Sequence, residues 1–270
     1  MAYFRIRPIC LMDNSNIGVS LKDEIIYGLN PVMEALRGKR TAFELFFAGA
    51  GTDRRFARLL QLAKEREVPI RPREKNDISR LCGTEHHQGV ALRAEAFAYA
   101  GMEDILERWR GSSESGLIVV LDGVQDPRNL GALIRSAACA GAHGVIIPKD
   151  RAVGVTAVVE KASAGAVETV PVAQVANIAQ TLDELKREGF WIYGAEGKAA
   201  ASLYDQDFRG NTAVVIGGEG EGIRSLVRKK CDYLVSIPIK GGVDSLNASV
   251  AGGVMLFEIV RQRNNTQRHI

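Results

Sequence analysis

The sequence lacks any long apolar run. No stretch approaches the roughly 20 consecutive apolar residues that a membrane-spanning helix needs. Near the start, Arg5 and Arg7 precede Pro8, and neither a long hydrophobic segment nor a small-residue cleavage site follows, so we expect no signal peptide. The sequence therefore predicts a cytoplasmic protein without a membrane contact, and residues 1 to 23 are expected to form a disordered extension.

Cysteine and histidine are also scarce, with four of each in 270 residues. The cysteines are widely scattered, which predicts free thiols in a reducing compartment; they are Cys10, Cys82, Cys139 and Cys231. His86 and His87 are adjacent, so their side chains would diverge on a strand or a helix. No pair of these residues stands at metal-ligand spacing, and we expect no metal site.

The formal net charge is only +3, but the basic excess is concentrated in the first third of the chain. Residues 24 to 96 hold 13 Lys or Arg against 10 Asp or Glu, whereas residues 97 to 270 hold 19 against 20. Such an excess is typical of a surface that faces RNA phosphates, although a solvated helix face with ion pairs gives the same pattern. The candidate RNA-binding residues are Arg54, Arg55, Arg58, Arg71, Arg73 and Arg128.

Hydrophobic periodicity predicts a small α/β domain over residues 24 to 96. Its expected strands are 24–28, 43–48, 69–71 and 89–93, and its expected helices are 30–38, 54–67 and 77–81. Residues 97 to 112 are expected to link this domain to the rest of the chain. They contain a short amphipathic stretch and run into a Ser- and Gly-rich segment, a composition typical of linkers.

Residues 113 to 270 alternate between strands and helices more strongly. The expected strands are 117–121, 144–147, 170–172, 190–194, 212–217 and 233–238, and the expected helices are 130–140, 156–166, 178–188, 223–230 and 247–262. Near-continuous apolar strands separated by helices predict a parallel sheet covered on both faces. Ligands bind such sheets at the carboxyl ends of the strands, so three loops become candidates: 122–129, 217–222 and 238–247.

The first loop runs from a strand end into a helix. We expect Asn129 to cap this helix, and small residues surround Arg135 at the neighbouring helical positions. An arginine with small neighbours can bind a phosphate or carboxylate through two hydrogen bonds. A structural salt bridge is an equal alternative for Arg135.

The second loop, Gly217 to Gly222, is rich in glycine and precedes a helix, as a dinucleotide-binding loop does. The spacing does not fit, because Ile223 stands where a third glycine is needed. Glu219 and Glu221 would also repel a pyrophosphate at the helix N-terminus. Carboxylates are better tolerated beside a ligand with a positive centre, such as a sulfonium; an ordinary glycine-rich turn is the alternative.

The third loop passes from an apolar strand end to a helix that begins with Ser245, Asn247 and Ser249. These short polar side chains can cap the helix and also offer amide and hydroxyl groups to an adenine or a ribose.

Together the three loops resemble the signature motifs of the SpoU (TrmH) branch of the SPOUT RNA methyltransferases. The first contributes Asn129 and Arg135, the second a G-x-E-G-x-G sequence, and the third Ser-Leu-Asn-Ala-Ser after Ile-Pro-Ile. This resemblance covers about residues 113 to 263. Residues 26–36 and 86–90 resemble the substrate-binding domain of a bacterial 23S rRNA methyltransferase of the same branch.

The resemblance implies an α/β SPOUT-type catalytic domain with a deep trefoil knot, over residues 113 to 270, behind a ribosomal-protein-like α/β substrate-binding domain. It implies S-adenosylmethionine as the cofactor and a site completed across a homodimer. The cofactor-binding residues it implies are Gly217, Gly218, Glu219, Gly220, Ile237, Ile239, Leu246, Asn247 and Ala248. The catalytic residues it implies are Asn129, Arg135, Glu219, Ser245 and Asn247.

The implied reaction is attack of a ribose 2'-oxygen on the sulfonium methyl group, which requires alignment and removal of the hydroxyl proton. The implied target is a guanosine of 23S rRNA near the peptidyl-transferase centre. Proposals for the family use the arginine matched by Arg135 as the base, but a guanidinium with a pKa of about 12.5 or more resists deprotonation. We therefore assign Arg135 to phosphate positioning, and expect Glu219 to orient Arg135 or Asn129.

Three alternatives stay open from the sequence. The substrate could be tRNA or another rRNA nucleotide, as for an antibiotic-resistance enzyme. The protein could be a non-catalytic RNA-binding assembly factor, which failure to bind S-adenosylmethionine would favour. A nucleotide-binding oxidoreductase is the third, and binding of a nicotinamide cofactor would favour it.

Overall fold

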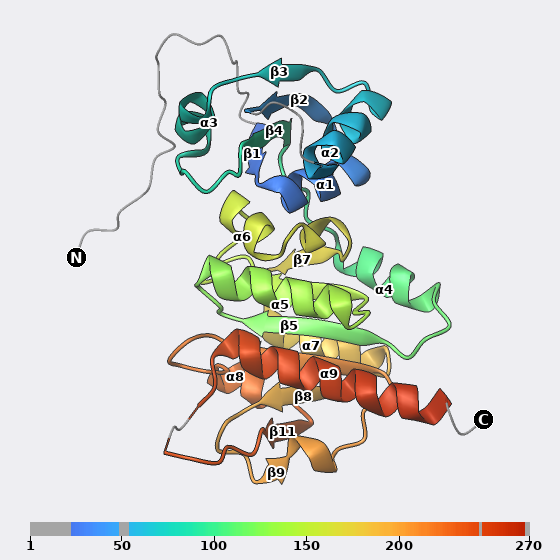
Figure 1. Ribbon diagram of the computed structural model, residues 1–270. Helices are drawn as coiled ribbons and strands as arrows, with labels where there is room; N and C mark the ends of the chain where they lie inside the picture. Colours follow the sequence, from blue (N-terminus) through green and yellow to red (C-terminus); the bar gives the residue numbers. More distant parts are fainter. Residues whose placement is uncertain (1–22, 49–53, 243–244, 268–270) are drawn as a thin grey trace.

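The computed structural model describes residues 23–48, 54–242 and 245–267, and it contains two β-sheets (Figure 1). The smaller sheet is built from residues 23 to 95 and the larger from residues 117 to 236. The expected disordered extension, apart from Asp23, lies outside the described residues.

The first sheet has four strands in the order β1-β4-β2-β3. The elements follow in the order β1 (Asp23–Tyr27), α1 (Leu29–Arg37), β2 (Ala42–Phe47), α2 (Arg54–Glu65), β3 (Ile70–Pro72), α3 (Lys75–Cys82) and β4 (Val90–Glu95). Strand β4 pairs antiparallel with β1 and β2, whereas β3 pairs parallel with β2. Apolar side chains of α1 and α2 pack with Leu45 and Leu92 to form the core of this domain.

The second sheet has seven strands in the order β7-β6-β5-β10-β8-β11-β9, and every pairing in it is parallel. Its strands are β5 (Leu117–Asp122), β6 (Gly144–Pro148), β7 (Val172–Val175), β8 (Trp191–Ala195), β9 (Ala201–Ser202), β10 (Thr212–Gly217) and β11 (Tyr233–Ser236). Parallel strands need crossover connections, which the intervening helices supply.

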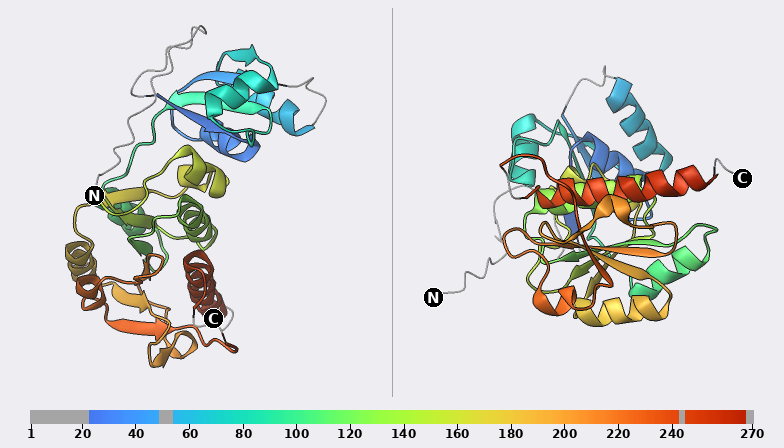
Figure 2. Two further views of the ribbon diagram at one scale, coloured as in Figure 1. Left: turned by 90° about the vertical axis from the view of Figure 1, so that its left-hand side faces the viewer. Right: turned by 90° about the horizontal axis from the view of Figure 1, so that it is seen from below.

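Helices cover both faces of this sheet (Figure 2). Alternate residues of β5 point to opposite faces: Leu117, Val119 and Leu121 join one core cluster, and Ile118 and Val120 join another. The first face carries α5 (Pro127–Cys139), α6 (Ala157–Ala162) and α9 (Ala248–Gln267). The second carries α4 (Met102–Arg110), α7 (Ile178–Arg187) and α8 (Ser225–Arg228).

The expected parallel sheet is confirmed, and several local features differ from the expectations. Helix α6 ends at Ala162 because Ala164 and Gly165 adopt left-handed backbone conformations, and a 3-10 turn η1 (Ala166–Glu168) follows. Helix α8 is only four residues long. Strand β9 was not expected, and α4 lies within the expected linker and packs through Ile105 and Leu106 onto the second core cluster.

The described part of the chain has no helix that is long and apolar enough to cross a membrane. Within the same residues, no group of three or more His, Cys, Asp or Glu side chains is placed to hold a metal ion.

Candidate active site

The first two candidate loops begin side by side at the carboxyl edge of the large sheet. Strands β5 and β10 are neighbours, and their last residues, Asp122 and Gly217, are paired in register. The amide of Gly218 donates to the carbonyl of Asp122 at 3.0 Å. Parallel pairing therefore brings together two motifs that are about 90 residues apart in the sequence, as expected from the strand-end rule.

An ion pair that the sequence did not reveal joins these loops. Asp122 is fully buried, and its carboxylate accepts hydrogen bonds from the Nε of Arg224 at 2.7 Å and from the backbone amide of Arg224 at 2.8 Å. Arg224 lies two residues beyond Gly222, the last residue of the glycine-rich loop. A buried aspartate at the end of an apolar strand was the only signal that could have pointed to it, because carboxylates are rarely buried without a partner.

The glycines of the second loop allow the loops to approach closely. A Cβ on Gly218 would lie 2.2 Å from the carbonyl oxygen of Gly123, and one on Gly217 would lie 2.1 Å from the carbonyl carbon of Gly222. Gly220 and Gly222 have φ values of 89° and 67°, a region that favours glycine. This loop is therefore a close-packed turn, and its glycines do not follow dinucleotide-binding spacing.

Three predicted catalytic residues form one hydrogen-bonded chain across the three loops. The side-chain amide of Asn247 donates to the Oδ1 of Asn129 at 3.1 Å. Asn129 in turn donates from its Nδ2 to the Oε1 of Glu219 at 2.6 Å. The expectation that Glu219 orients Asn129 is met, and the interaction is a charge-assisted bond.

The expectation that Asn129 caps helix α5 is wrong. Asp126 is the N-cap, its side chain accepts from the backbone amide of Arg128, and Pro127 occupies the first helical turn. Proline is favoured there because it lacks an amide hydrogen and has a suitable φ. The earlier start places Asn129 inside the helix, where its side chain is free to bond Glu219 and Asn247.

Glu219 is held in its ionised form. Burial alone would raise its pKa, but hydrogen bonds from the Asn129 side chain and from the backbone amides of Glu219, Gln125 and Asp126 outweigh this effect. The net result is a pKa below its ordinary value of 4.5, because hydrogen bonds to a carboxylate favour the charged form.

Asn247 also caps α9, as expected for the third loop. Its Oδ1 accepts from the backbone amide of Ser249 at 2.9 Å and from the Ser249 hydroxyl at 2.6 Å. A Cβ on Gly252 would lie 2.3 Å from Leu133, so α9 and α5 are closely packed. Their amino-terminal turns therefore meet where Asn129 and Asn247 bond. Ser245, another predicted catalytic residue, is exposed beside this junction.

Arg135 lies on the solvent-exposed side of α5. Its guanidinium makes no hydrogen bond or ion pair with any other residue that the structure describes, so neither the structural salt bridge nor an interaction with Glu219 is found there. The surrounding small residues leave this cation accessible, which is what a phosphate-binding side chain requires.

The predicted cofactor residues fit a ligand with an apolar ring and a positive centre. Ile239 and Leu246 are 37% and 39% exposed, so their apolar side chains are accessible to a ligand. Ile237 and Ala248 are half-buried beside them in the chain, and Gly220 faces open space. The exposed backbone and apolar side chains suit an adenine face, and Glu219 supplies negative charge at the same edge.

The predicted RNA-binding residues lie in two places. Arg58 on α2, Arg71 on β3 and Arg73 after β3 are exposed on the small domain. Among the described residues, Arg71 has a long, 3.5 Å contact with Glu44. Arg128 is exposed in the first turn of α5, close to Asn129 in the chain. The side chains of Arg54 and Arg55 lie outside the described residues.

Arg66, which contributes to the basic excess of the small domain, has a structural role instead. Its guanidinium donates to the carbonyls of Ala35, Leu36, Gly38 and Arg40, at 2.9 to 3.2 Å. It therefore stabilises the carboxyl end of α1 and the loop that follows.

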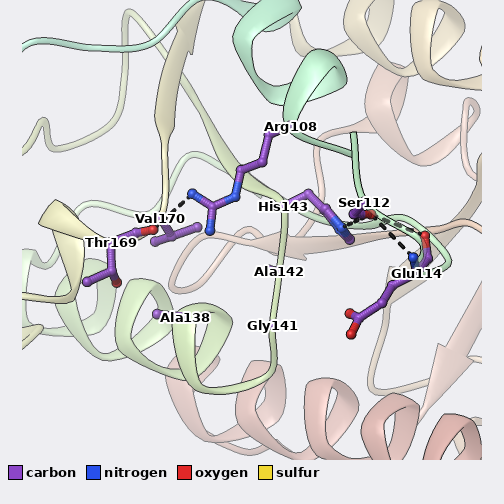
Figure 3. Close-up of a pocket in the computed structure, with 9 residues that line it drawn as sticks. All are labelled: Arg108, Ser112, Glu114, Ala138, Gly141, Ala142, His143, Thr169 and Val170. Atoms are coloured by element: carbon purple, nitrogen blue, oxygen red, sulfur yellow. Dashed lines mark hydrogen bonds between the residues drawn. The ribbon is translucent and has the colours of Figure 1, made fainter. Parts of the chain in front are cut away.

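A pocket of about 300 Å³ lies at the opposite edge of the sheet, near the starts of β5 and β6 (Figure 3). His143 lines it, with its Nδ1 accepting from the Leu117 amide at 3.1 Å and its Nε2 paired with the Ser112 hydroxyl at 3.0 Å. Burial lowers the pKa of His143, so the ring is neutral and both nitrogens are engaged. The pocket is separate from the three loops, and its polar groups serve packing.

Comparisons with known proteins agree with this geometry. Residues 116–257 match the SpoU rRNA Methylase family, and residues 25–100 match an RNA 2'-O ribose methyltransferase substrate-binding domain. The 23S rRNA (guanosine-2'-O-)-methyltransferase RlmB of Ralstonia nicotianae is 45% identical over 90% of this chain and 97% of its own length. RlmB of Xanthomonas campestris is 42% identical over 91% of this chain and 99% of its own.

A solved structure adds evidence on the cofactor. The SpoU methyltransferase AviRb from Streptomyces viridochromogenes, in complex with AdoMet, superposes with a TM-score of 0.75 and 25% identity over 90% of this chain and 92% of its own. By sequence, fold and site, this chain belongs to the SpoU family of S-adenosylmethionine-dependent RNA 2'-O-ribose methyltransferases.

Proposed function

We propose that this protein methylates the ribose 2'-oxygen of a guanosine in 23S rRNA, near the peptidyl-transferase centre. The observation that carries the proposal is the Asn247–Asn129–Glu219 chain of hydrogen bonds, which joins all three signature loops. The similarity to RlmB proteins over nine-tenths of the chain supports the choice of substrate.

S-adenosylmethionine supplies the methyl group when bound, and we assign its binding to the backbone and side chains of Gly217 to Gly220, Ile237, Ile239 and Leu246 to Ala248. The ionised Glu219 fixes the amide of Asn129, and Asn129 fixes that of Asn247. Each amide thereby has one defined orientation before RNA arrives. Such preorganisation lowers the cost of aligning the reacting hydroxyl.

Arg135 is assigned to the RNA phosphate beside the target ribose. It is exposed, lies on the same helix as Asn129, and has no partner among the described residues that would compete with a phosphate. A guanidinium binds phosphate through two parallel hydrogen bonds. It would also stabilise negative charge that develops on the ribose oxygen as its proton leaves.

We further propose a homodimer, with α9 in the interface. Val250 and Phe257 are each 50% exposed on this helix and are seven residues apart, so they lie on one face. Exposed large apolar side chains along one helix face are typical of protein interfaces. The knotted arrangement of the catalytic domain and a cytoplasmic location with the ribosome belong to the same proposal.

Transfer of a radiolabelled methyl group from S-adenosylmethionine to RNA tests this function. The purified protein should label 23S rRNA transcripts and not tRNA, and ribonuclease mapping should place the label on one guanosine. Arg135→Lys should keep cofactor binding within about twofold but lose most turnover, because lysine cannot bind phosphate in a bidentate manner. Arg187→Lys, at an exposed position of α7, is the matched control and should retain full activity.

If the protein labels tRNA alone, tRNA replaces 23S rRNA as the proposed substrate. Failure to bind S-adenosylmethionine at all would favour a non-catalytic assembly factor, and near-normal turnover of Arg135→Lys would remove Arg135 from the mechanism.

A further inference from the structure

A buried ionic cluster joins the two domains. Arg40, in the loop between α1 and β2, forms ion pairs with Glu160 on α6 at 2.6 Å and with Glu168 on η1 at 2.8 Å. It also bonds Glu24 on β1. The side chains of Arg40, Glu160 and Glu168 are only 8%, 3% and 9% exposed, so this cluster is far more buried than an ordinary surface ion pair.

The surfaces around the cluster are closely packed. Gly165 precedes η1 with a φ of 87°, and a Cβ there would lie 2.6 Å from the Cβ of Glu34 on α1. Lys161, the chain neighbour of Glu160, donates to the carbonyl of His86 and lies 5.3 Å from the ring centroid of Tyr27. Contacts at three points define an orientation, whereas a single pair would act as a hinge.

The segment that receives the small domain is itself fixed to the catalytic helix. A Cβ on Gly131 would lie 2.5 Å from the Cβ of Ala162 and 2.8 Å from the carbonyl of Val159, so α5 and α6 are in close contact. Gly131 is two residues beyond Asn129. Figure 1 shows α6 between the small domain and α5. A rigid path of packed elements therefore runs from the small domain to Asn129.

We propose that Arg40, Glu160 and Glu168 are positioning residues that hold the substrate-binding domain on the α6–η1 segment, so that RNA bound by this domain presents its ribose to Asn129 and Glu219. The RNA part of this inference rests on the proposed function, whereas the docking of the domains does not. Arg66 supports the arrangement, because it donates to the carbonyl of Arg40 and fixes the loop.

The cluster contains more carboxylates than cations. Burial, followed by the nearby charge of Glu24, raises the pKa of Glu160 to about 8, although Arg40 opposes the shift. One carboxyl oxygen of Glu160 is buried without a hydrogen-bond partner among the described residues. The other charged or titratable groups around the cluster are Glu24, Glu34, Arg40, Tyr99, Lys161 and Glu168.

The raised pKa gives docking a defined pH dependence. An exposed Glu160 in separated domains would have its ordinary pKa of 4.5, and burial in the docked state also raises the pKa of Glu168. Docking is therefore linked to proton uptake, and the docking constant falls as the pH rises from about 4.5 toward about 8. Above about pH 8 the carboxylate is ionised in both states and the dependence ends.

Spin-label distance measurements on the full-length chain test the docking. One label is placed at the exposed Cys139 on α5 and one at Arg80→Cys on α3, with Cys10 replaced by serine. At pH 6 the parent should give a narrow distance distribution. Arg40→Met should broaden it, because Glu24, Glu160 and Glu168 all lose the guanidinium that they contact. Arg37→Met removes an exposed pair within α1 and should leave the distribution narrow. A parent-like narrow distribution in Arg40→Met overturns the proposal.

A second variant, which changes packing and not charge, tests the docking independently in case Arg40→Met does not fold. Gly165→Ala should broaden the distribution, because its methyl group would meet Glu34. Gly189→Ala is the matched control, since Gly189 has a similar φ of 82° and no atom within 4 Å of the added Cβ. Equal distributions in the two variants would contradict the packing argument.

The same distance measurement tests the pH dependence. The distribution of the parent should broaden between pH 6 and pH 8.5, whereas that of Glu160→Gln, which cannot ionise, should not. Equal broadening in this variant would contradict the role of Glu160.

Kinetics test the positioning. Arg40→Met should lower kcat for rRNA at least tenfold, with a smaller change in the KM for RNA and with the Kd for S-adenosylmethionine within twofold of the parent. Undocked domains with unchanged kcat would overturn the positioning role. If the distance results hold but even the parent methylates no RNA, the proposed function fails and the docking stands.

Discussion

The ion pair between Asp122 and Arg224 yields a sharp prediction about the stability of the site. Asp122→Ala would leave the guanidinium of Arg224, which is 35% exposed, without its buried partner, and would remove the acceptor of the Arg224 backbone amide. Removal of one member of a buried pair costs about 3 to 5 kcal/mol. For a domain of this size that corresponds to a fall in melting temperature of about 10 °C.

Thermal and urea unfolding of the purified variants would measure this effect. The matched control is Glu196→Ala, which breaks a 3.0 Å pair with Arg228 whose side chains are 31% and 52% exposed. That pair should contribute less than about 1 kcal/mol. The double variant Asp122→Ala/Arg224→Ala should be destabilised by at least about 2 kcal/mol less than the sum of the single variants.

The prediction extends to the cofactor, because Asp122 joins the first two signature loops. S-adenosylmethionine affinity should fall at least tenfold in Asp122→Ala and stay unchanged in Glu196→Ala, as measured by calorimetry below the melting temperature. A loss of stability below 1 kcal/mol in Asp122→Ala would refute the reasoning that this pair joins the loops.

Three further predictions follow from the same geometry. Gly218→Ala should reduce S-adenosylmethionine affinity more than tenfold, because its methyl group would collide with the Gly123 carbonyl, whereas Gly210→Ala has open space and should bind normally; calorimetry would distinguish them. Asn129→Ala removes a hydrogen bond that lowers the pKa of Glu219, so the stability that ionised Glu219 contributes above pH 4.5 should be lost at a higher pH on acidification; unchanged acid denaturation would contradict this. In a Cys10→Ser background at pH 8, maleimide should label the exposed Cys139 alone, because burial raises the pKa of Cys82 and of Cys231 to about 12; intact mass showing two or three labels would contradict it.

Much of the fold could be predicted from the sequence, because apolar strands alternate with helices over most of the chain. The parallel sheet and the meeting of three loops at its carboxyl edge follow from that pattern. Short elements were harder to predict from the sequence. Strand β9 has two residues, too few for a periodic signal, and α6 ends at left-handed residues that periodicity does not reveal.

The chemistry of the site was predictable only in part. The motifs identified Asn129, Glu219 and Asn247, and the structure brings them into hydrogen-bond contact. The early helix start at Asp126 was missed because Asn129 is itself a good capping residue. The partners in the Asp122–Arg224 and Arg40–Glu160 pairs could not be predicted, since each pair joins residues about 100 or more positions apart and no local pattern records such contacts.

The assignment to 23S rRNA is tested most directly by site-resolved mapping of ribose methylation in 23S rRNA from cells with and without this protein. Without the protein, one methylated guanosine in the peptidyl-transferase region should lose its mark, and the parent protein but not Arg135→Lys should restore it. If every rRNA ribose mark survived in the cells that lack the protein, the assignment to 23S rRNA would be contradicted.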